Sequence, residues 1–382
     1  MLNRSFNSVV SRESKQNGVY SPAQFVKQIE GIKSKHRIDI GQSDIKYVKS
    51  VRNRSRIFEV IGRLALWFGF DPFSFAIGVV FTFLHRNLEA VELGHNCLHG
   101  QYDSLGDIPE FHSHNFRWKA PIDEEGWRRE HNGIHHVQTN VYGIDPDLNH
   151  GFLRTNARLP WNRWHYIQVP LYLFYFYPQI MYKFNAQNLG FNEDFRANQF
   201  PNGNEGYALY PYKMDTKDRT SAKSRNRISI NRIVLKEYFI FPLLALITGY
   251  SWARVAVGNL IVDILNNYWM AFTLQSSHFT QELQEKQDTT KKASWYKAQI
   301  ESSINFKASK IITLMCGHVN YQIEHHLFPD IPSHRYPEIS FEVQAICEEH
   351  NIVYPVHSSW FMAIKKYLGV FVRYSFPPKK LQ

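Results

Sequence analysis

Residues 57–84 read IFEVIGRLALWFGFDPFSFAIGVVFTFL, which is two apolar runs separated by Asp71-Pro72. An aspartate followed by a proline is a turn signal, so the stretch predicts a pair of antiparallel helices. Neither run reaches the ~20 apolar residues of a typical membrane-spanning helix, and the first contains Glu59 and Arg63. The turn holds no Lys or Arg, whereas the segment before the first run is basic. We therefore expect a hairpin that enters and leaves a membrane on one side; buried helices of a soluble core are the alternative.

A second pair of apolar runs, at 233–249 and 255–272, follows a basic loop and repeats this pattern. The aromatic segment 164–182 is interrupted by Pro170 and Pro178, so it predicts a stretch that lies in the membrane surface. The expected fold is an all-α membrane protein with about four transmembrane helices in two hairpins and a cytoplasmic helical cap that holds a di-metal site. The expected spans are 57–70, 73–94, 233–249 and 255–272.

The 382 residues carry a net charge of +10, and the first 56 are polar and basic. We expect 1–56 to be a separate N-terminal segment beside an anionic membrane face, 57–370 the main domain, and 371–382 a tail. Three cysteines far apart in the sequence indicate a reducing compartment, and the start of the chain shows no apolar leader. We therefore expect an integral, multi-pass membrane protein whose active site faces the cytoplasm. Nucleic acid is not an expected partner.

Histidines gather in three short motifs: GHNCLHG at 94–100, REHNGIHHVQTN at 129–140 and NYQIEHHLFP at 320–329. The first motif spaces its histidines at i and i+4, which places both rings on one face of a helix. Neutral imidazole is the commonest metal ligand in proteins, and a closed zinc site needs only four ligands. The three motifs hold seven of the 18 histidines, so they predict two metal ions. The seven are His95, His99, His131, His135, His136, His325 and His326.

The identity of the metal stays open at this point, because imidazole suits zinc, copper, iron and nickel. The chain has no His-Glu-x-x-His motif, which argues against a zinc protease. The first and the third histidine motif each follow a predicted hairpin, and His278 follows the last apolar run. Four spans would therefore bring every one of these histidines to the same side of the membrane.

Other polar residues are candidates for holding the rings in place. Glu92 lies one helical turn before His95 and would fix its tautomer. Asp145 and Asp147 would orient the rings of the second motif, or would form a turn around Pro146. The remaining histidines are expected to be structural or at the surface, with His112, His114 and His318 the ones considered for contact with the ligands. Four basic residues near the second motif are expected to meet an anionic headgroup or solvent: Arg117, Lys119, Arg128 and Arg129.

The three motifs resemble the histidine boxes of the membrane fatty acid desaturase family. The resemblance extends to Thr139-Asn140, to 145–147, to the LFP at 327–329 and to Arg335-Tyr336, and it covers roughly residues 55 to 360. Gln322 stands where many members have the first histidine of the third box, as in the bacterial acyl-CoA or acyl-lipid branch. His318 stands where members often have a small residue or Asn.

The resemblance implies an O2-dependent enzyme that uses two iron ions to introduce a double bond into a long acyl chain carried by CoA or a lipid. It implies as ligands the seven motif histidines together with His278 and Gln322. The chain contains no Gly-x-Gly-x-x-Gly motif and no haem-binding motif in its first 56 residues, so electrons are expected from a separate ferredoxin-like protein or reductase. A lipid hydroxylase of the same family is one alternative, and a non-catalytic membrane protein that binds metal or lipid is another.

Overall fold

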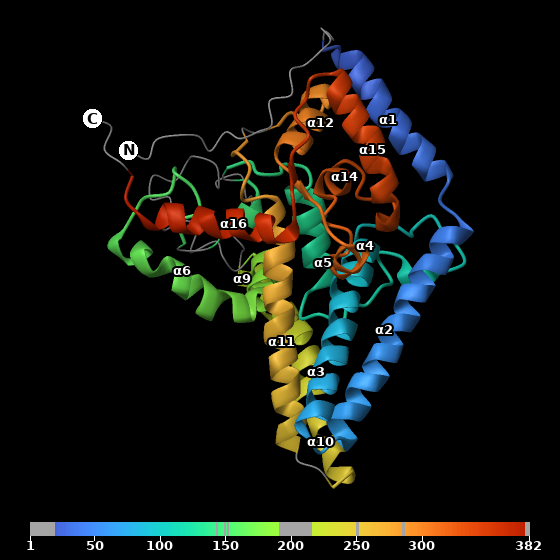
Figure 1. The fold of residues 1–382 in the computed structure, drawn as a ribbon, viewed down its shortest axis with the longest axis vertical. Helices are drawn as coiled ribbons and strands as arrows, with labels where there is room; N and C mark the ends of the chain where they lie inside the picture. The colour runs from blue at the N-terminus through green and yellow to red at the C-terminus, as the bar shows by residue number, and fades with distance from the viewer. Residues whose placement is uncertain are drawn as a thin grey trace.

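The computed structural model describes residues 20–142, 144–148, 150, 153–190, 216–249, 252–284 and 287–378. Four helices run alongside one another and converge at one end (Figure 1): α2 (Gln42–Phe68), α3 (Pro72–Asn87), α10 (Phe241–Ile247) and α11 (Trp252–Leu274). The opposite end is broader. It is built mainly from α1 (Pro22–Ile38), α12 (Lys292–Glu301), α14 (Gln322–Leu327) and α15 (Tyr336–Glu349).

Shorter elements complete the described part of the chain. Helix α16 (Trp360–Ser375) lies across the molecule beside α6 (Gln168–Leu171) (Figure 1). Two short parallel strands, β1 (Asn305–Phe306) and β2 (Val356–His357), pair with each other. The other α-helices are α4 (Asn96–Leu98), α5 (Glu124–Trp127), α7 (Ile180–Asn188), α9 (Thr216–Val234) and α13 (Lys310–Met315). The π-helices are η1 (Leu88–His95), η3 (Arg128–His135), η6 (Tyr172–Phe176) and η9 (Leu235–Ile240). The 3-10 turns are η2 (Pro109–Phe111), η4 (Pro146–Leu148), η5 (Arg163–Ile167), η7 (Tyr177–Gln179), η10 (Gln275–Ser277) and η11 (Ser333–Arg335).

The turn predicted at Asp71-Pro72 joins α2 to α3. The carboxylate of Asp71 accepts hydrogen bonds from the backbone N–H groups of Phe73 and Ser74, and Pro72 occupies the first turn, where a missing N–H costs nothing. The two helices then pack closely, because a Cβ atom on Gly62 would lie 2.5 Å from the Thr82 hydroxyl. A small residue at this crossing therefore sets the distance between the helices.

The prediction of four membrane-spanning helices is wrong. Within the described ranges, no helix combines the length and the apolar character needed to cross a membrane. The predicted runs belong to helices that also hold charged and amide residues: α2 begins in the basic segment, and α11 contains Asn259, Asp263 and Asn267. The expected integral, multi-pass membrane location, with a site facing the cytoplasm, is contradicted by the same finding. The segment at 164–182, expected in a membrane surface, forms short helical pieces between η5 and α7.

Charged residues inside this helical bundle pair with one another. Glu237 accepts hydrogen bonds of 2.6 Å from both Arg63 and Arg86, and Arg86 also contacts Asp263 at 3.0 Å. Arg63 donates a further hydrogen bond to Asn259. These side chains come from α2, α3, η9 and α11, so the network joins four segments that are far apart in the sequence. It explains how charged residues can occupy the runs that hydropathy marks as apolar.

Residues 22–56 form α1 and the first half of α2, and both pack on the rest of the chain. Phe25, Ile29 and Ile32 of α1 are buried against α12 and α15. In the first turn of α2, Asp44 accepts two hydrogen bonds of 2.7–2.8 Å from the guanidinium of Arg335. The N-terminal helices thus form part of the broad end of the molecule.

Candidate metal centre

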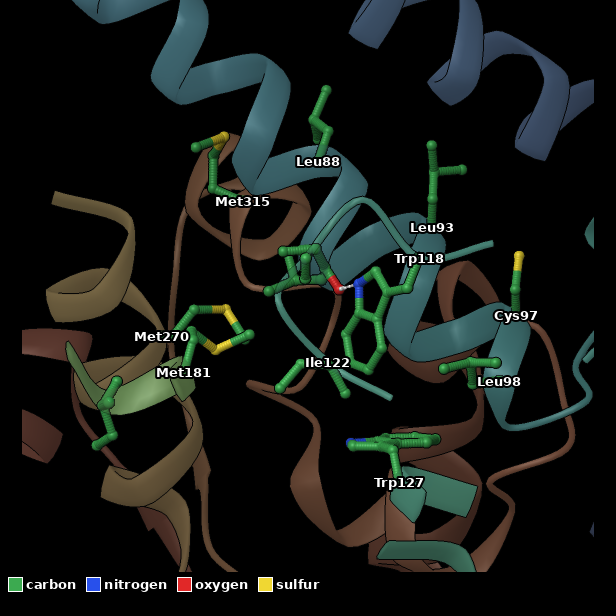
Figure 2. Packing of buried hydrophobic residues seen from close by; sticks show 14 of the residues in the cluster. Leu88, Leu93, Cys97, Leu98, Trp118, Ile122, Trp127, Met181, Met270 and Met315 are labelled. Atoms are coloured by element: carbon green, nitrogen blue, oxygen red, sulfur yellow. Dashed lines mark hydrogen bonds between the residues drawn. The ribbon is translucent and has the colours of Figure 1, made fainter. Parts of the chain in front are cut away.

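The first histidine motif continues directly from α3. The helix passes into the π-helix η1, which ends at His95, and His99 caps the short helix α4 at its C-terminal end. π-Helical turns inside α-helices are uncommon and frequent at functional sites. The two rings meet edge to face with centroids 4.6 Å apart. Beside them, Gly94 leaves room for Trp118, whose indole N–H donates to the Ala90 carbonyl (Figure 2).

The second motif repeats this geometry. The cap residue Asp123 starts α5, which passes into the π-helix η3. That helix carries His131 and His135, and His136 follows at its end. The stacked rings of Trp127 and His131 have centroids 4.4 Å apart.

The third motif lies on α14, which contributes Gln322, His325 and His326. His278 follows η10 at the end of α11. Its Nε2 lies 3.1 Å from Nε2 of His326 and 2.7 Å from the amide nitrogen of Gln322. All nine residues predicted as ligands therefore come together.

The rings form two separate groups, which a third group joins. His95, His99, His131 and His325 each offer a ring nitrogen, and these atoms all lie within 4.8 Å of one another. His135, His278 and His326 make the second group, and His136 forms the third with His325 and His326. A zinc ion lies ~2 Å from an imidazole nitrogen, so each of the two separate groups is compact enough to surround one ion. His325 and His326 each belong to one separate group and to the group that joins them.

Burial determines the charge of these rings. It lowers the pKa of His95 to about 4 and of His278 to about 3, and neighbouring rings add to the shift at His278. The pKa values of five others lie well below the ordinary value for the same reason. Those five are His99, His131, His136, His325 and His326. Neutral imidazole is the form that binds a metal ion, so burial prepares these rings as ligands.

His135 differs from the other rings. Burial opposes its charge, but Asp145 and Asp147 outweigh burial and raise the pKa of His135 to about 9. Asp145 lies 2.9 Å from Nδ1 of His135 and also accepts the backbone N–H groups of Asn140 and Asp147. Asp147 lies 3.6 Å from the same ring nitrogen. These carboxylates leave Nε2 of His135 facing the other rings, which is the arrangement expected around a metal-binding histidine.

The remaining candidates lie farther out. Glu92 is fully buried and bonds to Nδ1 of His318 at 2.9 Å, to the Tyr47 hydroxyl at 2.7 Å and to Ser333, rather than to the ring of His95. His318 has a positive φ of 59°, which is uncommon outside glycine. His112 bonds to the Leu105 carbonyl in the loop that follows the first motif.

Sequence reasoning missed three polar residues that hold the ligand rings. Thr139 and Gln299 contact Nδ1 of His326 at 3.0 and 3.2 Å. The side-chain oxygen of Asn96 lies 3.3 Å from Nδ1 of His95. Asn96 and Thr139 stand inside the motifs, where a functional residue was to be expected. Gln299 lies on α12 and gives no sequence signal.

Unpaired atoms support the fit of a metal to this donor set. Nε2 of His99, Nδ1 of His136, Nδ1 of His325 and Oε1 of Gln322 are buried and have no hydrogen-bond partner among the described residues. Unpaired buried polar atoms are costly, and lone pairs aimed at one place are satisfied together by a cation. The residues present therefore fit a centre with two metal ions.

An apolar cavity of about 60 Å³ begins at the histidines. His95, His131, His135, His278 and Gln322 are part of its lining. Trp118, Ile122, Trp127, Met181 and Met270 also line it, and Figure 2 shows the two methionines next to each other and apart from Trp118 and Trp127. Phe184, Leu274 and Phe279 complete the apolar lining. Its apolar lining suits methylene groups, and about 60 Å³ is room for a short stretch of an alkyl chain beside the metal centre.

The comparisons with known proteins agree with this geometry. The family model for fatty acid desaturases matches residues 65–358. The chain is 29% identical to the NADPH-dependent stearoyl-CoA 9-desaturase of Mycobacterium tuberculosis, over 90% of this chain and 77% of that protein. It is 24% identical to the acyl-lipid (8-3)-desaturase of Mortierella alpina, over 63% of this chain and 52% of that protein. It is also 24% identical to the sn-1 linoleoyl-lipid 6-desaturase of Arthrospira platensis, over 62% of this chain and 61% of that protein.

Proposed function

This chain belongs to the fatty acid desaturase family, and we propose that its eight clustered histidines hold two iron ions next to a bound acyl chain. Its activity is that of a fatty acyl desaturase, an oxidoreductase. The main support for the proposal is the apolar cavity, because four of the clustered rings are part of its lining. Iron, when bound, supplies the O2-dependent oxidation that removes hydrogen from an unactivated alkyl chain.

The side chains of the protein supply position and environment. Trp118, Ile122 and Met270 would hold the alkyl chain by apolar contact and exclude water from the reacting carbons. Asp145 would hold the ring of His135 through Nδ1 and direct Nε2 to a metal ion. Gln322 would act as a ligand or would position His278, since its amide lies 2.7 Å from that ring.

The substrate is proposed to be a long acyl chain on CoA or on a lipid. The named relatives include both kinds, a stearoyl-CoA desaturase and acyl-lipid desaturases. A separate ferredoxin-like protein or reductase is proposed to deliver the electrons, because the chain has no dinucleotide-binding glycine motif. A net charge of +10 would favour an acidic donor.

The test combines metal analysis with product analysis. We expect the purified protein to contain about two iron ions per chain, and His135→Ala and His326→Ala to lose iron and to form no unsaturated product. His114→Ala is the matched control, because this histidine is exposed and outside the cluster. Two zinc ions and no iron in the purified protein would contradict the proposal and favour a non-catalytic metal-binding protein. Hydroxylated product without unsaturated product would identify a hydroxylase.

The electron donor has its own test. Purified, iron-loaded protein is mixed with acyl-CoA and NADPH, with and without an added ferredoxin and its reductase. We expect double-bond formation only with the added proteins. Turnover with NADPH alone would refute a separate donor.

A further inference from the structure

Gln275 places an unpaired polar group in the apolar cavity, in addition to the unpaired atoms of the metal-binding set. Gln275 lines the cavity and is 4% exposed, and its amide nitrogen Nε2 has no hydrogen-bond partner among the described residues. Of the lining residues nearest to Gln275 in the chain, Leu274 and Phe279 are apolar, and His278 belongs to the metal-binding set. A buried N–H donor without an acceptor is unfavourable, so this group is suited to a ligand that brings an oxygen atom.

The other end of the same amide is firmly held. Its oxygen Oε1 accepts hydrogen bonds from the hydroxyls of Tyr172, at 2.9 Å, and Tyr367. Both tyrosines are buried, and the Tyr172 hydroxyl also bonds to Nδ1 of His150 at 2.8 Å. The two tyrosines come from η6 and α16, so two separate elements orient Gln275. A fixed oxygen leaves Nε2 as the end of the amide that is free to bind.

Gln275 also lies close to the metal centre. It starts the 3-10 turn η10, and His278 follows that turn, with the backbone N–H of His278 donating to the Gln275 carbonyl. Both Gln275 and His278 line the cavity. A group bound to Nε2 would therefore share the cavity with the ring of His278.

We propose that Gln275 determines specificity by donating a hydrogen bond from Nε2 to the carbonyl oxygen of the bound acyl chain. This inference rests on the proposed function, since it places an acyl chain in the cavity. The carbonyl of a CoA thioester and that of a lipid ester offer the same acceptor. Tyr172 and Tyr367 are positioning residues, because they act through the Gln275 amide.

The first test measures binding of matched ligands to the iron-loaded protein by titration calorimetry. One pair is stearoyl-CoA and octadecyl-CoA, a thioether that lacks the carbonyl; the other is a stearoyl phospholipid and its alkyl ether. We expect the carbonyl compound of one pair to bind about tenfold more tightly, as for one hydrogen bond, and the pair that shows this preference identifies the carrier. Gln275→Met should bind both members of that pair equally.

Two further variants separate a role in binding from a role in stability. Gln275→Glu keeps the oxygen that accepts from the tyrosines and removes the amide donor, so the carbonyl preference should again be lost even if Gln275→Met does not fold. Gln168→Met is the control, because Gln168 is a buried glutamine paired with backbone groups of Arg154 and Phe371 and absent from the cavity lining. It should keep the tenfold preference whatever its thermal stability.

The outcomes distinguish the inference from the proposed function. Equal binding of carbonyl and ether ligands by the unaltered protein would overturn the role of Gln275 and leave the acyl site intact. No binding of any of the four ligands would contradict the acyl site itself.

Discussion

At the level of single residues, the centre depends on keeping its rings neutral and correctly turned. Burial lowers the pKa of seven of the eight clustered histidines, which leaves their nitrogen lone pairs available at neutral pH. His135 instead has a carboxylate at Nδ1. A bound cation at Nε2 and an anion at Nδ1 would share that ring, which is a common arrangement in metal sites.

Asp145→Asn tests this arrangement. The substitution keeps the size of the side chain but removes the charge that faces Nδ1 of His135. We expect iron affinity to fall about 10- to 100-fold, as for other changes to groups that hold a ligand ring. Competition with a chelator measures the affinity. Asp107→Asn, at an exposed aspartate, should leave it unchanged, and an unchanged affinity in Asp145→Asn would refute the role of this carboxylate.

At the level of elements, two π-helices carry the first two motifs to the same place. Both η1 and η3 continue from an α-helix and end at a histidine of the cluster, His95 and His135. The wider π-helical turn changes the direction of the side chains that follow it. The i and i+4 spacing in the sequence suggested a regular α-helix and could not show this, because π-helical turns arise where tertiary packing favours them.

The glycines of these π-helices provide a matched pair of substitutions. A Cβ on Gly94 would lie 1.9 Å from Nε1 of Trp118, whereas the nearest atom to a Cβ on Gly133 is 3.9 Å away. We expect Gly94→Ala to displace Trp118 from the cavity wall and to lower the free energy of unfolding by about 1–3 kcal/mol or more. Gly133→Ala should change it by less than about 0.5 kcal/mol. Denaturant unfolding followed by tryptophan fluorescence compares the two; equal stability would contradict the packing described.

At the level of the whole molecule, polar contacts join segments that are remote in the sequence. Glu237 holds Arg63 and Arg86, and Asp44 holds Arg335. Burial opposes the charge on Glu237, but the two arginines outweigh it and lower the pKa of Glu237 to about 2. Arg63, Arg86 and Glu237 are all buried, so removal of one partner leaves the others without compensation.

Glu237→Gln is therefore expected to lower the free energy of unfolding by about 3–5 kcal/mol at neutral pH, measured with urea. Because the pKa of Glu237 is lowered in the folded protein, its contribution is complete above the ordinary value of 4.5 and is lost as the pH falls toward 2. As the pH falls through that range, the free energy of unfolding of the variant should decrease less than that of the unaltered protein. Glu301→Gln, which removes an exposed partner of Lys297, should cost less than about 1 kcal/mol.

The N-terminal helix offers a test of how far the folded unit extends. Phe25 is completely buried against α12 and α15, whereas Ile38 at the end of the same helix is 82% exposed. We expect Phe25→Ala to lower the free energy of unfolding by about 3–5 kcal/mol and Ile38→Ala to have little effect. Thermal unfolding compares them. Equal stability of the two variants would mean that α1 does not belong to the cooperative unit.

The amino-acid sequence was sufficient to name the residues that lie together in the candidate site and to predict part of the fold. Three histidine motifs, His278 and Gln322 identified the residues that meet in the centre, and Asp71-Pro72 located the turn between α2 and α3. Both are local signals, since ring type, spacing and turn residues can be recognised within a few positions. The apolar runs, in contrast, led to membrane spans that the helices do not support.

Only the tertiary structure showed which side chains pair with one another when they are far apart in the sequence. Hydropathy could not show that Arg63 pairs with Glu237, nor that Glu92 bonds to His318 instead of His95. The unpaired amide of Gln275 became visible only with Tyr172 and Tyr367 in place around it. Contacts of this kind join residues that are separated by most of the chain, and their energies depend on burial and direction. Both quantities exist only once the helices have packed.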